Sequence, residues 1–171
     1  MHKPKPVGRP IISGCDGPTE RISSLVDHLL QPIAMRQNSY IKDTTDFINF
    51  VQETTIPQDT ILVSKDVTSL YENIPQDDGI QTVCNPYENF HNNNPPSHYL
   101  KQMLGLILEE NSFEFKGENY LQTHGTAMGT KMAVTVAFAN IFMAEIETNL
   151  LNQSRIKPIA WKRYIDDVFS L

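Results

Sequence analysis

The chain has 171 residues, of which 40% are hydrophobic and 20% charged, and its formal net charge is −6 at pH 7. This composition is typical of a globular protein and excludes wholesale disorder, and the length suits one domain with a substantial core. An acidic balance taken alone argues mildly against a nucleic-acid partner.

The charge is unevenly distributed along the chain. Residues 1–9 contain three basic side chains and no acidic one, and residues 155–171 contain four basic and two acidic side chains. Residues 10–154 contain 7 basic and 18 acidic side chains. The two ends are therefore basic and the middle is acidic, which the net charge alone does not show.

Neither cysteines nor apolar runs place the chain outside the cell or in a membrane. Cys15 and Cys84 are too few for a disulfide framework or a zinc cluster, so we expect reduced thiols in an intracellular protein. The longest apolar run, residues 132–144, is too short to span a bilayer. The first ten residues (MHKPKPVGRP) contain no apolar stretch and do not resemble a secretory signal.

The first part of the chain predicts two helices and then a strand. Residues 19–31 have apolar side chains at helical spacing, and this helix is expected to close at the proline that follows. Residues 44–53 predict a second helix, capped by Asp43 or Thr44. Residues 60–67 (TILVSKDV) are short, apolar and partly β-branched, which predicts a buried strand.

The remaining elements follow from hydrophobic spacing and from turn residues. In chain order they are a turn at 71–75, a short helix at 77–84, a helix at 97–110, a hairpin at 113–121, a Gly-punctuated loop at 124–129, a helix at 130–152, and strands at 159–165 and 168–171. The apolar face expected for the helix at 97–110 consists of Tyr99, Met103, Leu106 and Ile107. This order is an α+β pattern, with helices packed on one face of a small antiparallel sheet.

Three aspartates follow apolar segments. Asp66 ends the strand predicted at 60–67, and Asp166 and Asp167 lie between the last two predicted strands. Each feature alone also fits a capping aspartate or an ordinary charged turn. If the two segments are neighbours in the sheet, however, the carboxylates face one another and require a counter-charge. Mg²⁺ prefers such hard oxygens, and two metal ions about 4 Å apart need shared carboxylates.

The ordered set of motifs resembles the fingers and palm of a reverse transcriptase. Residues 164–167 (YIDD) match the palm motif Tyr-x-Asp-Asp, and residues 65–71 (KDVTSLY) match the first palm motif, an Asp with an aromatic residue five positions later. Residues 8–13 (GRPIIS) match a fingers segment. Residues 122–130 (QTHGTAMGT), followed by a helix containing residues 139–143 (ANIFM), match the Gly loop and helix of this family.

Three segments are most similar to the Penelope-like retroelements: residues 69–75 (SLYENIP), 125–130 (GTAMGT) and 140–147 (NIFMAEIE). The resemblance implies a right-hand polymerase fold, with a fingers-like part at residues 1–58 and a palm at residues 59–171. We expect the chain to be truncated before the thumb and before any endonuclease domain. Processive synthesis is therefore not expected from these residues alone.

The resemblance also implies a catalytic centre with two Mg²⁺ ions, for which Mn²⁺ is an alternative. Asp66 and Asp166 are implied as the shared ligands, with the backbone carbonyl of Val67 assisting, and Asp167 as the supporting carboxylate. Tyr71 is implied as a steric gate that excludes a 2′-hydroxyl group. A tyrosine of the hydrophobic core is the alternative for Tyr71.

The nucleotide-binding residues implied by the resemblance lie outside the acidic cluster. Arg9 is expected to clamp the triphosphate, with Lys5 assisting, because a planar guanidinium suits phosphate oxygens. Gln122, Gly125 and Gly129 are expected to form the loop against which nucleotide and template lie, since glycine permits close backbone approach. Solvated tail residues and a simple turn before a helix are the alternatives.

The activity implied is RNA-directed DNA polymerisation: addition of dNTPs to the 3′-hydroxyl of a DNA primer on an RNA template. We expect a nuclear protein without membrane association. Three alternatives stay open. They are an inactive or host-retained retroelement fragment, a telomerase-like or RNA-templated RNA polymerase, and an unrelated Mg²⁺ phosphatase. Tyr71 disfavours RNA synthesis because its ring clashes with a ribose 2′-hydroxyl, and a phosphatase leaves Arg9 and the Gly loop unexplained.

Overall fold

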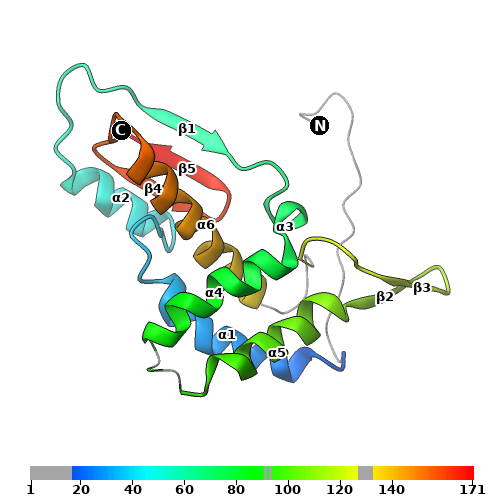
Figure 1. Cartoon of the computed structure of the whole chain (residues 1–171). Helices are drawn as coiled ribbons and strands as arrows, with labels where there is room; N and C mark the ends of the chain where they lie inside the picture. The colour runs from blue at the N-terminus through cyan, green and yellow to red at the C-terminus, as the bar shows by residue number, and fades with distance from the viewer. Residues whose placement is uncertain (1–16, 91, 93, 127–132) are drawn as a thin grey trace.

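The computed structural model describes residues 17–90, 92, 94–126 and 133–171, with the backbone alone for residues 133–135 (Figure 1). The described elements are, in chain order, α1 (Glu20–Ala34), α2 (Thr44–Glu53), β1 (Val63–Asp66), α3 (Leu70–Asn73), α4 (Gln76–Phe90), α5 (Ser97–Glu109), β2 (Ser112–Phe115), β3 (Glu118–Leu121), α6 (Ala133–Gln153), β4 (Trp161–Tyr164) and β5 (Asp167–Ser170). Within these ranges we find no helix with the length and apolar character needed to cross a membrane.

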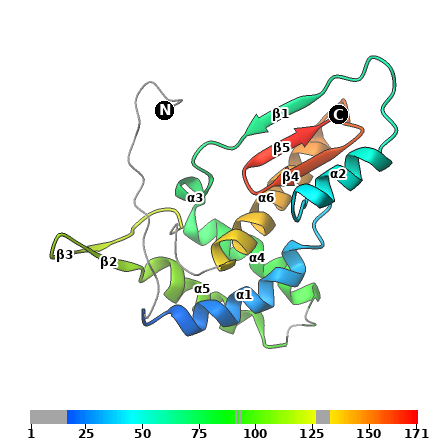
Figure 2. The ribbon, with the colours of Figure 1, turned by 180° about the vertical axis from the view of Figure 1, so that it is seen from behind.

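The hydrophobic core lies among α1, α4, α5 and α6 (Figure 2). Each helix contributes side chains with no exposed surface, such as Val26, Tyr87, Leu104 and Phe138. Gly79 permits the close packing of α4 on α6, because a Cβ atom there would lie 2.6 Å from Cζ of Phe138. The four helices therefore form a packed body to which the sheet is attached.

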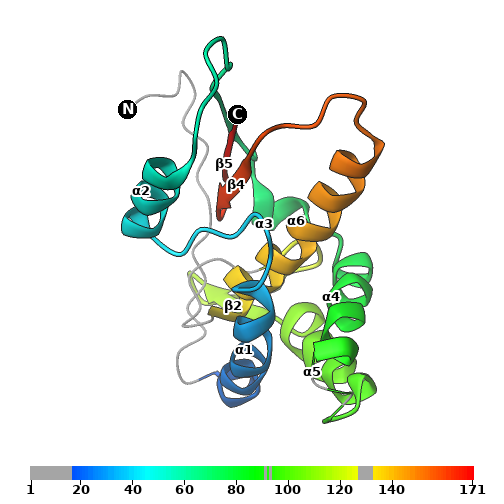
Figure 3. The same ribbon diagram turned by 90° about the vertical axis from the view of Figure 1, so that its left-hand side faces the viewer.

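The sheet lies between two helices. It is antiparallel with the strand order β1–β5–β4, and Figure 3 shows α2 on one side and α6 on the other. Phe47 of α2 contacts Phe169 of β5, with ring centroids 5.1 Å apart. On the opposite face, Arg163 of β4 forms an ion pair of 2.7 Å with Glu147 of α6. The prediction that helices cover one face only is therefore wrong. Lys162 and its ladder partner Phe169 point to the face that α2 covers, whereas Arg163, the next residue along β4, points to the face that α6 covers.

Several predicted elements are confirmed. The bounds of α2 are as predicted, and the Asp43 side chain accepts a hydrogen bond of 2.9 Å from the Asp46 N–H. Both predicted hairpins form, as β2–β3 and as β4–β5. The mixture of helices and small antiparallel sheets is also as predicted. A short helix, α3, replaces the turn expected over residues 71–75.

Two predicted helix ends are wrong because buried side chains extend the helices. α1 continues through Pro32, and Ile33 after it is buried in the core. α4 extends beyond residue 84, because Tyr87 is fully buried and its hydroxyl donates a hydrogen bond of 2.8 Å to the carbonyl of Pro95. Tertiary packing thus outweighs the local stop signals.

The strand predicted to be buried is largely exposed. β1 is shorter than predicted and pairs with β5 at the edge of the sheet. Lys65 and Asp66 are exposed, and Ile61 and Leu62 before the strand are 76% and 62% exposed. The apolar, β-branched sequence predicted a strand correctly, but it carried no information on whether a helix covers it.

The apolar face predicted for α5 is correct for Ile107, which is buried, and wrong for two of the other residues. Tyr99 and Leu106 are half exposed, whereas Met103 is partly buried against the core. The buried face consists of Leu100, Leu104, Ile107 and Leu108. Both sets have helical spacing, so the neighbouring helices, and not the periodicity, select the buried one.

Candidate active site

The sheet brings the acidic residues of two distant segments together. Asp66, the last residue of β1, lies directly opposite Asp167, the first residue of β5. The N–H of Val67 donates a hydrogen bond of 2.9 Å to the carbonyl of Asp166. Residues paired in an antiparallel ladder point to the same face, so the carboxylates of Asp66 and Asp167 share a face. Two like charges lie side by side there.

The turn that carries Asp166 has an uncommon backbone. Tyr164 and Asp167 close the hairpin, so Ile165 and Asp166 form its two-residue loop. Ile165 has a φ of +55°. Glycine usually occupies a first loop position with positive φ, and a β-branched residue there is strained by about 1–2 kcal/mol. Strained backbone of this kind is concentrated at functional sites.

Tyr71 lies near this turn, at the half-buried surface of α3. Burial raises the pKa of the Tyr71 hydroxyl, and the negative charge of Asp166 raises it further, whereas the Arg163 guanidinium lowers it. The phenol therefore keeps its proton to a higher pH than an unperturbed tyrosine does. The structure places Tyr71 near Asp166, which is compatible with a gate, and also packs it against the core, which is compatible with the alternative.

The start of the Gly loop is held against α3. Gly125 has a φ of +68°, and a Cβ atom there would lie 2.7 Å from the carbonyl oxygens of both Tyr71 and Glu72. The N–H of Thr126 donates to the Tyr71 carbonyl at 2.8 Å. Gln76 donates hydrogen bonds of 2.9 Å to the carbonyls of Gly125 and Leu108. The segment after Asp66 and the Gly loop are thus joined directly.

Gln122 makes its described contacts at the base of the β2–β3 hairpin. Its side chain accepts a hydrogen bond of 2.8 Å from Asn111 and donates one of 2.9 Å to the carbonyl of His124. A role toward nucleotide remains a prediction for this residue. The predicted residues Lys5, Arg9 and Gly129 lie outside the described residues.

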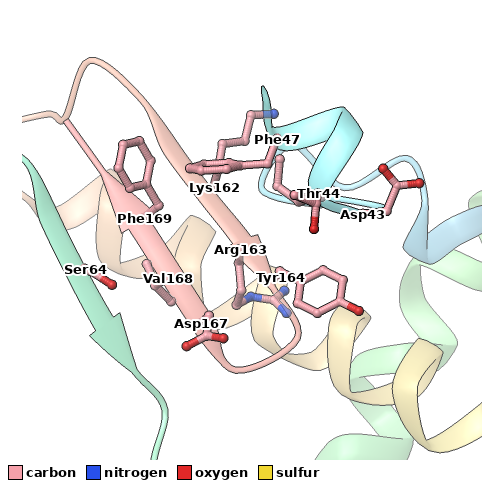
Figure 4. Close-up of a pocket in the computed structure, with 11 residues that line it drawn as sticks. Asp43, Thr44, Phe47, Ser64, Lys162, Arg163, Tyr164, Asp167, Val168 and Phe169 are labelled. Atoms are coloured by element: carbon pink, nitrogen blue, oxygen red, sulfur yellow. The ribbon is translucent and has the colours of Figure 1, made fainter. Parts of the chain in front are cut away.

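A cleft of about 400 Å³ lies between α2 and the sheet (Figure 4). It is lined by side chains of α2 and of the face that carries Asp167, among them Asp43, Phe47, Lys162, Tyr164 and Phe169. The cleft is thus continuous with the acidic face of the sheet, and its walls are mainly apolar. One of the paired carboxylates therefore borders an open space.

The donor set suits a magnesium ion that keeps much of its hydration. Among the described residues, no group of three or more His, Cys, Asp or Glu side chains is placed so that all could hold one metal ion. Mg²⁺ is usually held by one or two carboxylates, with water and substrate phosphates completing its shell. Asp66 and Asp167 supply such a pair, with Asp166 adjacent. The ladder pairs Asp66 with Asp167, whereas the resemblance paired it with Asp166.

Two residues of this region carry no motif signal and were not predicted. Gln76 joins α4 to the Gly loop. Arg163, predicted only as part of the basic end of the chain, is 1% exposed and paired with Glu147. Its charge is therefore not available to a surface ligand. The available signal was that Trp161 and Ile165, two positions before and after Arg163, are apolar, which predicts that Arg163 shares a buried face and needs a partner.

Comparisons with known proteins show a distant likeness of fold. No protein-family model matches the chain, and no curated protein matches it. A solved structure of apo telomerase from Candida tropicalis, truncated from its C-terminal domain, matches with a TM-score of 0.57 at 13% sequence identity. The match covers 90% of this chain and 33% of that chain. The chain thus spans about a third of the telomerase chain, and its fold resembles that part of the telomerase.

Proposed function

We propose that the chain contains the palm of a retroelement reverse transcriptase, similar to those of Penelope-like elements. It adds dNTPs to the 3′-hydroxyl of a DNA primer on an RNA template, in the nucleus. The observation that supports this proposal is the strand register that sets Asp66 opposite Asp167, on a fold that resembles a telomerase.

The aspartates are the proposed metal ligands. Asp66, Asp166 and Asp167, with the carbonyl of Val67, would hold two Mg²⁺ ions, which supply charge to activate the primer hydroxyl and to neutralise the leaving pyrophosphate. The negative face of the sheet, with its two opposed carboxylates, favours cations at this point and not elsewhere along β1. Mn²⁺ has similar ligand preferences and is expected to replace Mg²⁺.

The remaining predicted residues orient the substrates. The Tyr71 ring, which lies near Asp166, is the proposed steric barrier to a ribose 2′-hydroxyl. Gly125 lets the start of the Gly loop approach the backbone of α3 closely. Arg9 and Lys5 bind the triphosphate, and Gln122 and Gly129 complete the surface for nucleotide and template. Positioning of this kind supplies much of the rate acceleration in phosphoryl transfer.

Two measurements on the same protein test the proposal. Mn²⁺ titration followed by electron paramagnetic resonance should detect binding that Asp66→Asn and Asp167→Asn each weaken by at least about tenfold. Extension of a DNA primer on RNA should fall by more than about a hundredfold in the same variants. Asp59→Asn, an exposed aspartate in the loop before β1, is the matched control. Wild-type activity and Mn²⁺ affinity in Asp167→Asn would refute the site.

The fold likeness to telomerase favours a second candidate, a telomerase-like polymerase that copies an RNA bound to it. The two candidates differ in their template. A retroelement enzyme extends primers on added RNA of any sequence, whereas a telomerase-like enzyme produces a repeated sequence from its own RNA. Sequencing of the products made with and without added RNA separates them. Mn²⁺ binding without any extension supports the third possibility, an inactive fragment.

A further inference from the structure

The buried guanidinium of Arg163 connects the acidic turn to α6. We propose that Arg163 is a positioning residue, which fixes the Ile165–Asp166 peptide so that Asp166 and the following Asp167 are held beside Asp66. This inference rests on the proposed function, since it assigns the residue that orders the proposed metal site. Arg163 does not touch metal or nucleotide and acts through the turn.

Arg163 uses its whole guanidinium on internal partners. Its Nε donates to Glu147 at 2.7 Å, and Nη1 donates to the Asn140 side chain at 2.6 Å. Nη2 donates to the backbone carbonyl of Asn140 at 3.0 Å and to Glu147 at 3.5 Å. A fifth hydrogen bond, of 2.9 Å, runs from Nη1 to the carbonyl of Ile165. A guanidinium has five N–H donors, so these contacts occupy all of them.

The fifth contact, from Arg163 to the carbonyl of Ile165, reaches the backbone next to Asp166. A peptide unit is planar, so fixing the carbonyl of Ile165 also fixes the amide nitrogen of Asp166. Ile165 has the strained φ of +55°, and strained backbone persists only where its surroundings hold it. The carbonyl of Asp166 in turn accepts from the N–H of Val67 on β1. The turn is therefore held by two hydrogen bonds: one from Arg163 to the carbonyl of Ile165, and one from Val67, just after β1, to the carbonyl of Asp166.

α6 is the rigid support for the guanidinium. Asn140 and Glu147 are seven residues apart, which places them on the same side of the helix two turns apart. Both carboxylate oxygens of Glu147 have partners, because the Ser39 hydroxyl donates to Oε2 at 2.5 Å. The N–H of Arg163 donates to the Ser39 carbonyl at 2.6 Å. The arginine is thus held in place by contacts other than the one it makes with the turn.

Stability alone does not account for this network. Replacing a buried ion pair with apolar side chains is often neutral or stabilising, because desolvation offsets the attraction between the charges. A network with every donor used fixes geometry instead, and arginine does this better than lysine because its donors form a rigid fork. Lysine at position 163 keeps the charge but cannot bond Asn140, Glu147 and Ile165 together.

The experiment compares Arg163→Lys with Arg155→Lys, the same change at an exposed position. Hydrogen exchange measures the order of residues 164–168, and Mn²⁺ titration measures the metal site without any need for activity. We expect Arg163→Lys to exchange faster in the turn and to bind Mn²⁺ about 10–100-fold more weakly, the usual effect of losing a residue that orients ligands. Arg155→Lys should match the wild type in both measurements.

Circular dichroism shows whether Arg163→Lys folds. If it does not, Asn140→Ala serves as a second variant. It removes one acceptor of the guanidinium and keeps the ion pair, so a smaller change in the same two measurements is expected. Wild-type exchange in the turn and wild-type Mn²⁺ affinity in a folded variant would overturn the inference and leave the proposed function intact. A wild-type protein that binds no Mn²⁺ would overturn the proposed function, while the exchange data still decide whether Arg163 orders the turn.

Discussion

At the scale of single residues, Gly125 combines two constraints that can be separated. Its φ of +68° is unfavourable for other residues, and a Cβ atom would also contact the backbone of α3. Gly117 has a φ of +82° with nothing within 4 Å of its Cβ position, so it carries the first constraint alone. Alanine at position 117 should cost about 1 kcal/mol.

Alanine at position 125 should therefore be clearly worse than alanine at position 117. The backbone of α3 cannot move aside as a flexible side chain can, so we expect a loss of about 2–4 kcal/mol in total. For a chain of this length, that lowers the melting temperature by roughly 4–16 °C. Thermal melts of both variants measure the difference. Equal losses would show that the Gly loop does not lie against Tyr71 and Glu72.

Tyr71 predicts a pH effect on stability. Its pKa in the folded protein is raised above the ordinary value of 10.0, first by burial and then by Asp166. The folded state therefore holds the phenolic proton at a pH where the unfolded chain releases it. The contribution of this proton to stability is complete below about pH 10 and is lost as the pH rises through the folded-state pKa.

Phe at position 71 isolates this effect from other groups. Burial also raises the pKa of Tyr40 and of Tyr87, so the wild type alone cannot assign the loss. Urea midpoints between about pH 9 and pH 11 should fall more steeply for the wild type than for Tyr71→Phe. Parallel curves for the two proteins would mean that Tyr71 is not held neutral beside the turn.

At the scale of elements, Gln76 joins three segments at the start of α4. Its amide donates to Leu108 at the end of α5 and to Gly125 in the Gly loop. Gln76→Ala leaves both carbonyls without this partner, and we expect a loss of about 1–3 kcal/mol. Gln81→Ala, on the exposed side of the same helix, should change stability by less than about 0.5 kcal/mol. Chemical denaturation compares them, and similar values would contradict the joining role.

The elements were predictable to the extent that they depend on local pattern. The Asp43 cap and the spacing of α2 are local, and both are confirmed. The buried face of α5 depends on which neighbours it meets, so Tyr99 could not be separated from Leu100 by periodicity. Exposure of β1 likewise depends on the position of a strand within its sheet. Burial is decided between elements, where a single sequence gives little information.

At the scale of the whole molecule, the sequence singled out two of the aspartates but not the strand register that pairs them. Asp66 and Asp167 were selected from their sequence context, and the sheet sets them opposite one another. The register itself depends on how β1 aligns with β5, which is about a hundred residues away in the chain. The partners of Arg163 are similarly dispersed, at positions 39, 140, 147 and 165. No local pattern links such positions.

The opposed carboxylates predict a coupling between the site and the stability of the whole chain. Like charges directly opposite in a ladder destabilise it, so Asp167→Asn should stabilise the metal-free protein by about 0.2–1 kcal/mol. This corresponds to a rise of roughly 0.4–4 °C in melting temperature. The same change removes a proposed ligand. A ligand that binds the folded state at a hundred times its Kd stabilises it by about 2.7 kcal/mol.

Thermal melts with and without Mg²⁺ should therefore give opposite orders for the two proteins. Without the metal, Asp167→Asn melts at a higher temperature than the wild type, because the repulsion is relieved. With saturating Mg²⁺, the wild type gains more and becomes the more stable protein. Asp59→Asn, which changes the net charge equally and lies away from the ladder, should respond to Mg²⁺ as the wild type does. If Asp167→Asn gains stability but keeps the full Mg²⁺ response, the repulsion is real but Asp167 is not a ligand of the metal.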